Sequence, residues 1–245
     1  MAELATASRS ARAERTALDA DRRIRDTLRR CDLFSGLDEG VLSGLAASCS
    51  LVPFTRRRQI YSETESPTSL FVIATGRARV VRHDGEDRTL TVAYRGPREV
   101  IGETALLGGE TYKDAATATD HGEAVRVPIP NVLALLERPG FGTEMVRLML
   151  ERRLQAERRI ESLLSRTVES RVAEFLIDAA ERHGIPESRG TLIGVKYTHQ
   201  EIADYVGSTR ETVTLTLGDL KRRDLLLFDH RRAVIVDTAK LKRLV

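Results

Sequence analysis

The sequence predicts an α+β protein: an N-terminal antiparallel β-roll of the jelly-roll kind, a long helix, and a C-terminal winged helix-turn-helix. Short β-patterned runs separated by turn residues fill about residues 51–129, and many short strands at this spacing are typical of a jelly roll. A helical pattern without Gly or Pro then covers residues 143–165. Two helical patterns joined at a glycine follow over residues 198–223, ahead of two short strands.

Length and composition agree with this architecture. The chain has 245 residues, enough for two domains, with 41% hydrophobic and 31% charged residues. No apolar run approaches the ~20 residues that a membrane span needs, and residues 1–30 lack the apolar core of a secretory signal. We therefore expect a cytoplasmic protein without a membrane partner.

The charge is unevenly distributed. The net charge is only +3, but residues 1–30 carry eight arginines against five acidic residues, and residues 196–245 carry ten Lys or Arg against seven. Basic ends of this kind suit a polyanionic partner, although the solvated faces of helices have a similar composition.

The strands expected in the β-roll are short and end at turns that contain glycine. They cover residues 51–54, 69–74, 77–82, 89–94 and 124–129, with turns at Gly76, residues 84–85 and residues 96–97. A helical segment over residues 131–137 follows, and we expect Pro139 and Gly140 to end it.

The long helix predicted over residues 143–165 carries an apolar stripe, formed by Met145, Met149, Ala156, Ile160 and Leu163. A lone helix with such a stripe needs a partner, and a symmetric copy of the same helix is the simplest one. Packing against the protein's own β-domain alone is the alternative. Arg152 falls within the stripe, where an unpaired cation is expensive.

The first helix of the C-terminal pair begins with a capping box, Thr198 followed three residues later by Glu201. Gly207 permits a sharp turn, and Ser208 or Thr209 can cap the second helix. A basic hairpin of strands 225–228 and 233–236 follows, which is typical of a wing.

The second helix has an apolar face and an exposed N-terminal turn with polar side chains. Its apolar face is Val213, Leu217 and Leu220, which leaves Arg210, Glu211 and Thr214 as candidate readers of DNA bases. Arginine can donate two hydrogen bonds to guanine, and a carboxylate can accept one from cytosine. The candidates for phosphate contacts are Thr198, His199, Gln200, Ser208, Thr209 and Thr212.

Two other functions are weighed against DNA binding. The winged helix could contact a protein, with Arg210 and Glu211 as a surface ion pair, in a sensor module that regulates a partner without sequence-specific DNA binding. The basic cluster at residues 221–223 favours DNA. The third hypothesis, an enzyme, has little support, since the sequence has no P-loop, GxSxG or HExxH motif and no clustered His and Asp residues.

Several segments resemble one known family. THQEIADYVGSTRETVTLTLGDLKRRDLL is similar to the DNA-binding motif of the Crp/Fnr superfamily, and especially to its cyanobacterial nitrogen-control branch. LRRCDLFSGLD resembles the family's entry helix, SLFVIATGRARVVR its β-roll strands, and VIGETALLGG its effector cassette. Only residues 1–20 fall outside the resemblance.

The resemblance implies a transcription regulator that binds a palindromic operator as a homodimer, with half-sites about one helical turn apart. Double-stranded DNA and a second copy of the chain are the implied partners, and RNA polymerase is a further candidate. Arg210 and Glu211 match the family's base-reading pair. Leu215 stands where many members have a second base-reading arginine, and it can at most touch a thymine methyl group.

The resemblance also implies four segments. These are an N-terminal extension and helix (1–30), an effector-sensing β-roll similar to cyclic-nucleotide-binding domains (31–142), a dimerisation helix (143–168) and the DNA-binding domain (169–245). Effector state would act allosterically, by rotating the two recognition helices into or out of register with the DNA.

By the same resemblance, the residues of the effector pocket are Gly102, Glu103, Ala105, Leu106, Lys113 and Asp114. Cyclic-nucleotide-binding members have an Arg-Ser or Arg-Thr clamp where Lys113 and Asp114 stand. Lysine lacks the bidentate fork, and a carboxylate repels a phosphate. An alternative is that Lys113 and Asp114 pair with each other and leave the pocket structural.

The long helix also differs from the cyclic-nucleotide-binding members. The family places Arg152 opposite Glu103, but Ala156 and Glu157 replace its adenine-contacting hydroxyls. We therefore expect an effector other than tightly bound cyclic AMP, or a ligand-independent β-roll, with a cyclic nucleotide as the alternative.

No metal or prosthetic group is expected. Cys31 and Cys49 are too few for an iron–sulfur cluster, and His83, a single histidine beside a turn, does not indicate haem.

Overall fold

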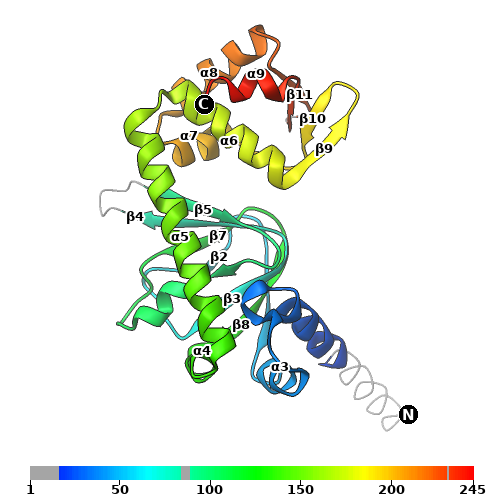
Figure 1. The fold of residues 1–245 in the computed structure, drawn as a ribbon, viewed down its shortest axis with the longest axis vertical. Helices are drawn as coiled ribbons and strands as arrows, with labels where there is room; N and C mark the ends of the chain where they lie inside the picture. The colour runs from blue at the N-terminus through cyan, green and yellow to red at the C-terminus, as the bar shows by residue number, and fades with distance from the viewer. Residues whose placement is uncertain (1–16, 84–88, 231) are drawn as a thin grey trace, which may run out of the picture. The chain divides into compact units, whose positions relative to one another are not determined.

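The computed structural model describes residues 17–83, 89–230 and 232–245 (Figure 1). The chain forms two compact units, Met1–Glu151 and Arg152–Val245, and the boundary falls within the long helix α5 (Pro139–Ser165). The predicted α+β class is confirmed, with antiparallel sheets first, a long helix next and a helix-turn-helix last. Within the described residues, no helix has the length and apolarity required to cross a membrane.

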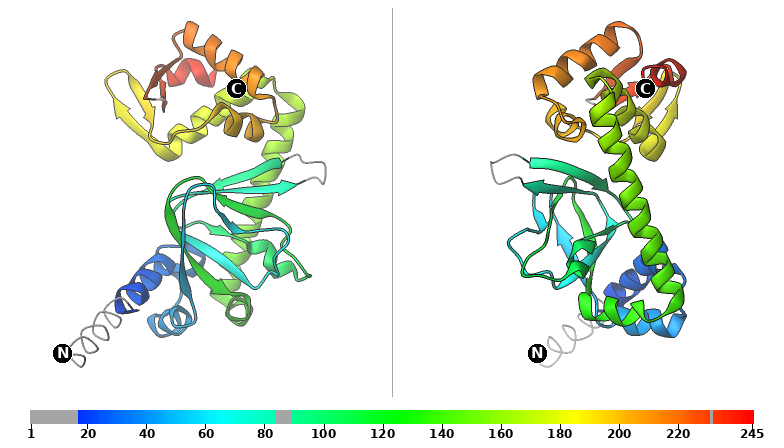
Figure 2. Two further views of the ribbon diagram at one scale, coloured as in Figure 1. Left: turned by 180° about the vertical axis from the view of Figure 1, so that it is seen from behind. Right: turned by 60° about the vertical axis from the view of Figure 1, so that its left-hand side comes forward.

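The first unit contains two four-stranded antiparallel sheets (Figures 1 and 2). One sheet has the order β1-β8-β3-β6, and its strands are β1 (Ser50–Phe54), β8 (Gly122–Pro128), β3 (Ser69–Thr75) and β6 (Val100–Ile101). The other has the order β2-β7-β4-β5, formed by β2 (Gln59–Tyr61), β7 (Ala115–Ala118), β4 (Ala78–His83) and β5 (Thr89–Arg95). The sequence pattern did not predict β2, β6 or β7, which are only two to four residues long.

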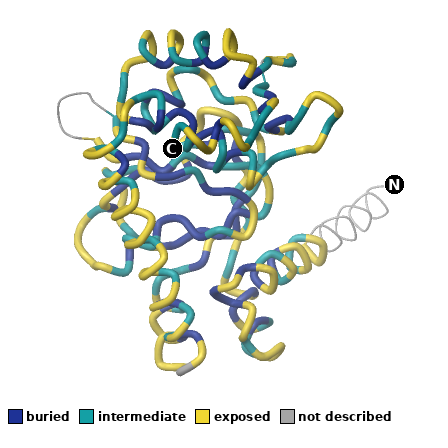
Figure 3. Tube along the Cα trace, turned by 45° about the horizontal axis from the view of Figure 1, so that its top comes forward, coloured by how far each residue is buried: buried dark blue, intermediate teal, exposed yellow. Residues whose placement is uncertain are grey.

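Strand β3 is buried on both faces, which explains why its sequence is a continuous apolar run. Leu70 and Val72 point into one hydrophobic core, while Phe71 and Ile73 point into another. The five residues 69–73 of β3 are all buried, and Figure 3 colours the whole chain trace by the burial of each residue.

Helical segments cover the first of these cores. They are the helical residues 17–29, α2 (Asp32–Ser35), α3 (Glu39–Ala46), α4 (Ile129–Leu136) and the start of α5. From them Leu28, Phe34, Leu42 and Met145 pack against the sheet. Met145 therefore leaves the predicted apolar stripe and belongs to the core of its own unit.

Helix α5 begins at Pro139, earlier than predicted. We expected Pro139 and Gly140 to separate two helices, but both lie in the first turn of α5. Proline is tolerated there because the first backbone N–H groups of a helix have no intrahelical acceptor to lose. The predicted turn at residues 84–85 lies outside the described residues.

The second unit is a helix-turn-helix combined with a four-stranded sheet. Its helices are α6 (Val168–His183), α7 (His199–Val206), α8 (Arg210–Arg222) and α9 (Thr238–Lys242). The sheet has the order β11-β12-β10-β9, formed by β11 (Leu226–Asp229), β12 (Arg232–Ile235), β10 (Gly190–Ile193) and β9 (Gly184–Glu187). The predicted hairpin is thus only half of a sheet, and the β9–β10 half escaped prediction because its strands are short and contain Gly and Pro.

Helix α7 begins with the predicted capping box. Thr198 Oγ1 accepts the backbone N–H of Glu201 at 3.1 Å, and the Glu201 carboxylate accepts the backbone N–H of Thr198 at 2.7 Å. Gly207 ends the helix with φ +64°, a left-handed conformation that side chains disfavour. Thr209, one of the two predicted caps, then caps α8 by accepting the N–H of Thr212 at 3.2 Å.

Helix α8 contains residues that are poor helix formers. Thr214 and Thr216 donate their hydroxyl protons to backbone carbonyls one turn earlier, and Gly218 lies in the same helix. Its stability in the fold therefore comes from the buried face that Val213, Leu217 and Leu220 provide.

We predict opposite effects of alanine at two glycines of the helix-turn-helix. Gly207→Ala should lower the free energy of unfolding by about 1–2 kcal/mol, because alanine is strained at positive φ. Gly218→Ala should raise it by about 0.5–1 kcal/mol, because Gly218 is helical and a new Cβ would meet only the end of the Arg222 side chain, at 3.7 Å. Urea unfolding of both variants measures the free energy of unfolding. A decrease at both positions would contradict the predicted difference between the turn glycine and the helical glycine.

Candidate nucleic-acid interface and effector pocket

The side chains predicted to read DNA bases lie together at the start of α8. Arg210, Glu211 and Thr214 are all exposed, whereas Val213 and Leu217 on the opposite face are buried. One further residue lies on the exposed side: Leu215, one turn after Glu211, has 73% of its surface accessible to solvent.

A hydrogen bond that the sequence did not predict joins the two helices. Nδ1 of His199, the first residue of α7, lies 2.7 Å from Oγ1 of Thr214 in α8. The same Thr214 hydroxyl donates to the backbone carbonyl of Arg210 at 2.8 Å. The hydroxyl of a predicted base reader is therefore engaged within the protein.

The residues predicted to contact phosphate gather at the N-termini of α7 and α8. Thr198 and Thr209 are the helix caps, and the Gln200 side-chain amide donates to Asp204 at 2.6 Å. The hydroxyls of Thr209 and Thr212 lie 2.9 Å apart, and Ser208 is half-buried between the helices. A capping hydroxyl accepts a backbone N–H but keeps its own proton, so capping leaves it able to donate to a phosphate.

The C-terminal part of α5 contacts the helix-turn-helix through hydrogen bonds and packing. The Arg159 guanidinium lies 4.7 Å from the centre of the Tyr205 ring and donates to the Tyr205 carbonyl at 2.8 Å. The Ser162 hydroxyl donates to Glu174 of α6 at 2.6 Å. Leu163 packs on the turn, since a Cβ added at Gly207 would lie 2.8 Å from its Cδ2.

Three residues of the predicted effector pocket, Glu103, Ala105 and Leu106, lie in a short 3-10 helix, η1 (Glu103–Leu107). Gly102 precedes it with φ +77°, close to the Tyr61 and Phe71 rings. Glu103 and Leu106 are half-buried and Ala105 is buried. Lys113 is exposed, whereas Asp114 next to it points inward and is only 8% accessible.

Asp114 is held by hydroxyl groups, and no ion pair between it and Lys113 is found among the residues that the structure describes. Its carboxylate accepts from the Tyr61 hydroxyl at 2.8 Å and from the Thr104 hydroxyl at 3.3 Å. Tyr61 also packs on Tyr112, with ring centres 4.5 Å apart, and the Tyr112 hydroxyl donates to the Ser69 carbonyl. These hydroxyl partners come from distant strands and loops, which is why sequence spacing did not reveal them.

Burial raises the pKa of Asp114 from an ordinary 3.8 to about 6. The negative charge of Glu103 raises this pKa further, while the hydrogen bonds from Tyr61 and Thr104 lower it. Burial is also the main cause of the raised pKa of the Tyr61 hydroxyl, followed by the charge of Asp114.

The stripe residues of α5 have different surroundings. Met149, Ala156 and Ile160 are exposed, while Arg152 and Leu163 are half-buried. Glu103 and Arg152 belong to different units, so their pairing stays a prediction.

The cysteines and the histidine considered for cofactors have ordinary protein surroundings. Cys31 is buried, and burial raises the pKa of the half-buried Cys49 thiol to about 12. His83 Nδ1 lies 2.9 Å from a Glu63 carboxylate oxygen.

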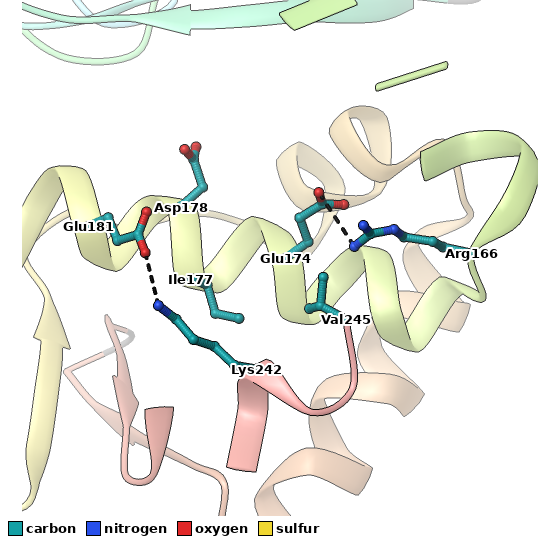
Figure 4. A pocket seen from close by; sticks show the side chains of 7 residues that line it. All are labelled: Arg166, Glu174, Ile177, Asp178, Glu181, Lys242 and Val245. Atoms are coloured by element: carbon teal, nitrogen blue, oxygen red, sulfur yellow. Dashed lines mark hydrogen bonds and ion pairs between the residues drawn. The ribbon is translucent and has the colours of Figure 1, made fainter. Parts of the chain in front are cut away.

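A separate open hollow of about 450 Å³ lies in the second unit between α6 and α9 (Figure 4). Its charged side chains already pair, Arg166 with Glu174 at 3.6 Å and Lys242 with Glu181 at 3.3 Å. We assign it no ligand.

Comparisons with known proteins agree with both units. Residues 51–139 match the cyclic nucleotide-binding domain family, and residues 170–244 match the Crp-like helix-turn-helix domain family. The chain is 31% identical over 193 residues to the global nitrogen regulator of Synechococcus elongatus, which covers 78% of this chain and 87% of that protein. It is 26% identical over 221 residues to the CRP-like cAMP-activated global transcriptional regulator of Mycobacterium tuberculosis, covering 89% and 98% of the two chains.

Among solved structures, a Crp/Fnr-family transcriptional regulator from Thermus thermophilus matches with a TM-score of 0.66 and 27% identity, over 80% of this chain and 97% of that one. A β-roll of the cyclic-nucleotide-binding type and a Crp-like helix-turn-helix on one chain define a DNA-binding transcriptional regulator, and not an enzyme. The chain belongs to the Crp/Fnr family of such regulators, as its sequence motifs predicted.

The raised pKa of Asp114 predicts how stability changes with pH. The unfolded chain loses the Asp114 proton near pH 4 and the folded chain near pH 6, so this group lowers stability as pH rises between these values. Asp114→Asn keeps an acceptor oxygen for Tyr61 and removes this decrease, which is on the order of 3 kcal/mol at pH 7. Urea unfolding between pH 4 and 7 measures the two slopes.

Asp219→Asn is the matched control. Hydrogen bonds from Arg223 and then Arg222 hold the pKa of the exposed Asp219 carboxyl below its usual value, so its contribution has the opposite sign. The stabilisation from the ionised Asp219 carboxyl is fully present above about pH 4 and is lost as the pH falls and the carboxyl takes up a proton. An unchanged pH slope in Asp114→Asn would show that the Asp114 carboxyl titrates normally.

Proposed function

We propose that the protein binds a palindromic DNA operator as a homodimer, under allosteric control of its β-roll. The observation that carries this proposal is the set of exposed side chains on the first turn of α8, Arg210 and Glu211 above all. A guanidinium and a carboxylate supply the donor and the acceptor needed to distinguish G·C pairs in a major groove.

The surface of α5 supports a two-fold assembly. Large apolar side chains that stay exposed on this helix are Val146, Met149, Leu150, Leu154, Ile160 and Leu164. Ile160 is 56% and Leu164 84% accessible, and the two lie one turn apart. Exposed apolar side chains at both ends of such a face, on either side of the Arg153–Glu157 ion pair, are expected to pack against a second helix, and a copy of α5 would cover the same face on each chain.

The proposed effector is a small molecule other than tightly bound cyclic AMP. Of the two clamp positions, Asp114 points inward to Tyr61 and Thr104, and Lys113 alone supplies a cation. One lysine is a weaker ligand for a cyclic phosphate than a bidentate arginine. The Mycobacterium tuberculosis relative is named as cAMP-activated, so cyclic AMP belongs in any screen with other cyclic mono- and dinucleotides and 2-oxoglutarate. Ligand-dependent shifts in thermal unfolding would identify the effector.

Three further statements stay predictions: RNA polymerase as a partner, a cytoplasmic location, and the division into segments 1–30, 31–142, 143–168 and 169–245.

We predict that Arg210→Ala with Glu211→Ala changes the selected DNA sequence. Each good bidentate base contact contributes about 1–3 kcal/mol of discrimination, so the double variant should lose preference at the contacted base pairs. Selection from a random duplex pool followed by sequencing measures it. Arg222→Ala, at the other end of α8, is the control and should leave the selected sequence unchanged. If the unaltered protein selects no duplex sequence, the alternative sensor that acts on a partner protein is favoured instead.

We predict that Ile160→Glu with Leu164→Glu produces a monomer. Four buried carboxylates in a two-fold interface would be unpaired and too costly to desolvate. Light scattering after size-exclusion chromatography measures the mass, and DNA binding should weaken because only one half-site is engaged at a time. The control, Arg158→Glu, changes an exposed residue on another side of α5 and should remain a dimer. A dimeric double variant would rule out this stripe as the interface.

A further inference from the structure

The hydrogen bonds of Thr214 determine what this residue can offer to DNA. A hydroxyl group has a single proton, and that of Thr214 goes to the Arg210 carbonyl at 2.8 Å. His199 Nδ1, 2.7 Å from the same oxygen, must then be the donor of the second bond. With its proton donated and one lone pair occupied, the Thr214 hydroxyl keeps one lone pair, and the methyl group is the other part of this exposed side chain that can contact DNA.

Leu215 adds a second apolar group on the same exposed side. It follows Thr214 directly and is 73% accessible, in a helix whose other apolar side chains, Val213, Leu217 and Leu220, are buried. Thr214 lies one helical turn after Arg210, and Leu215 one turn after Glu211. The apolar pair therefore continues the surface that Arg210 and Glu211 begin.

The surroundings of Leu215 indicate that it contacts a small apolar group. Among the exposed side chains of the first two turns of α8, Leu215 is surrounded by polar residues, and one leucine with one methyl group is too little apolar surface for a protein partner. A DNA major groove offers an apolar group of matching size, the C5-methyl group of thymine.

We propose that Leu215 and the Thr214 methyl group read the C5-methyl group of a thymine in each half-site, while the Thr214 hydroxyl serves only to join α8 to His199. Leu215 and Thr214 are thus specificity-determining residues for an A·T pair next to the pairs that Arg210 and Glu211 contact. The inference rests on the proposed DNA-binding function and adds one recognised base pair to each half-site.

The test replaces single thymines of the selected operator with deoxyuridine, which removes only the C5-methyl group. For the unaltered protein we expect one symmetric position at which this replacement weakens binding about four-fold per half-site, the effect of about one buried methyl group. The other thymines should tolerate deoxyuridine. Equilibrium binding by fluorescence anisotropy at fixed salt measures each duplex.

Three variants assign the effect to its side chains. Leu215→Ala should lose most of the difference between thymine and deoxyuridine operators, and Thr214→Ser, which keeps the hydroxyl but lacks the methyl, should reduce the difference to a smaller extent. Thr214→Val keeps a methyl group and loses the hydroxyl, and it should retain the full difference. Urea unfolding of each variant is the control for an intact domain. We expect unchanged stability, because Thr214 and Leu215 are both exposed.

The outcomes separate this inference from the function beneath it. Three results would each overturn the inference. Deoxyuridine could be tolerated at every position, or the selected half-site could contain no thymine. The difference in affinity between thymine and deoxyuridine operators could also survive in Thr214→Ser but not in Thr214→Val. If base preference still disappears in the Arg210 and Glu211 double variant, the proposed function stands. If the unaltered protein shows no base preference at all, both fail.

Discussion

The left-handed turn at Gly207 is the constraint on which the DNA-binding surface depends. It sets the direction in which α8 leaves α7, and the buried face of α8 then decides which side chains stay exposed. The caps at Thr198 and Thr209 satisfy the N-termini of both helices, and the bond from His199 to Thr214 links the two. Leu163 of α5 packs directly on the turn, so the same point also receives the end of the long helix.

Helix α5 contributes to three different parts of the molecule along its length. Near its start, Met145 completes a core of the β-roll unit. In its second half, Ile160 and Leu164 leave apolar surface exposed, while Arg159 and Ser162 bond to α7 and α6. One helix therefore supplies side chains to the core of the first unit near its start and to the helix-turn-helix of the second unit near its end.

Much of this was predictable from the sequence, because the signals are local. Short β-patterned runs between turn residues located β1, β3, β4, β5 and β8, and the capping box with Gly207 located the helix-turn-helix. Features that depend on contacts between distant residues were missed. Tyr61 and Asp114 are 53 positions apart, and His199 and Thr214 come from different helices, so no spacing rule connects them. Weak strands such as β9 form because β10 lies beside them, which a local pattern cannot show.

The threonines and the glycine of α8 have a consequence for how the recognition helix is maintained. An isolated peptide of this sequence would have little helical content, because its β-branched residues and Gly218 oppose the helix. The helix exists because the rest of the domain supplies a surface for Leu217 and Leu220. The exposed positions of Arg210 and Glu211 therefore depend on side chains of the opposite, buried face of α8, which hold the helix in its helical state.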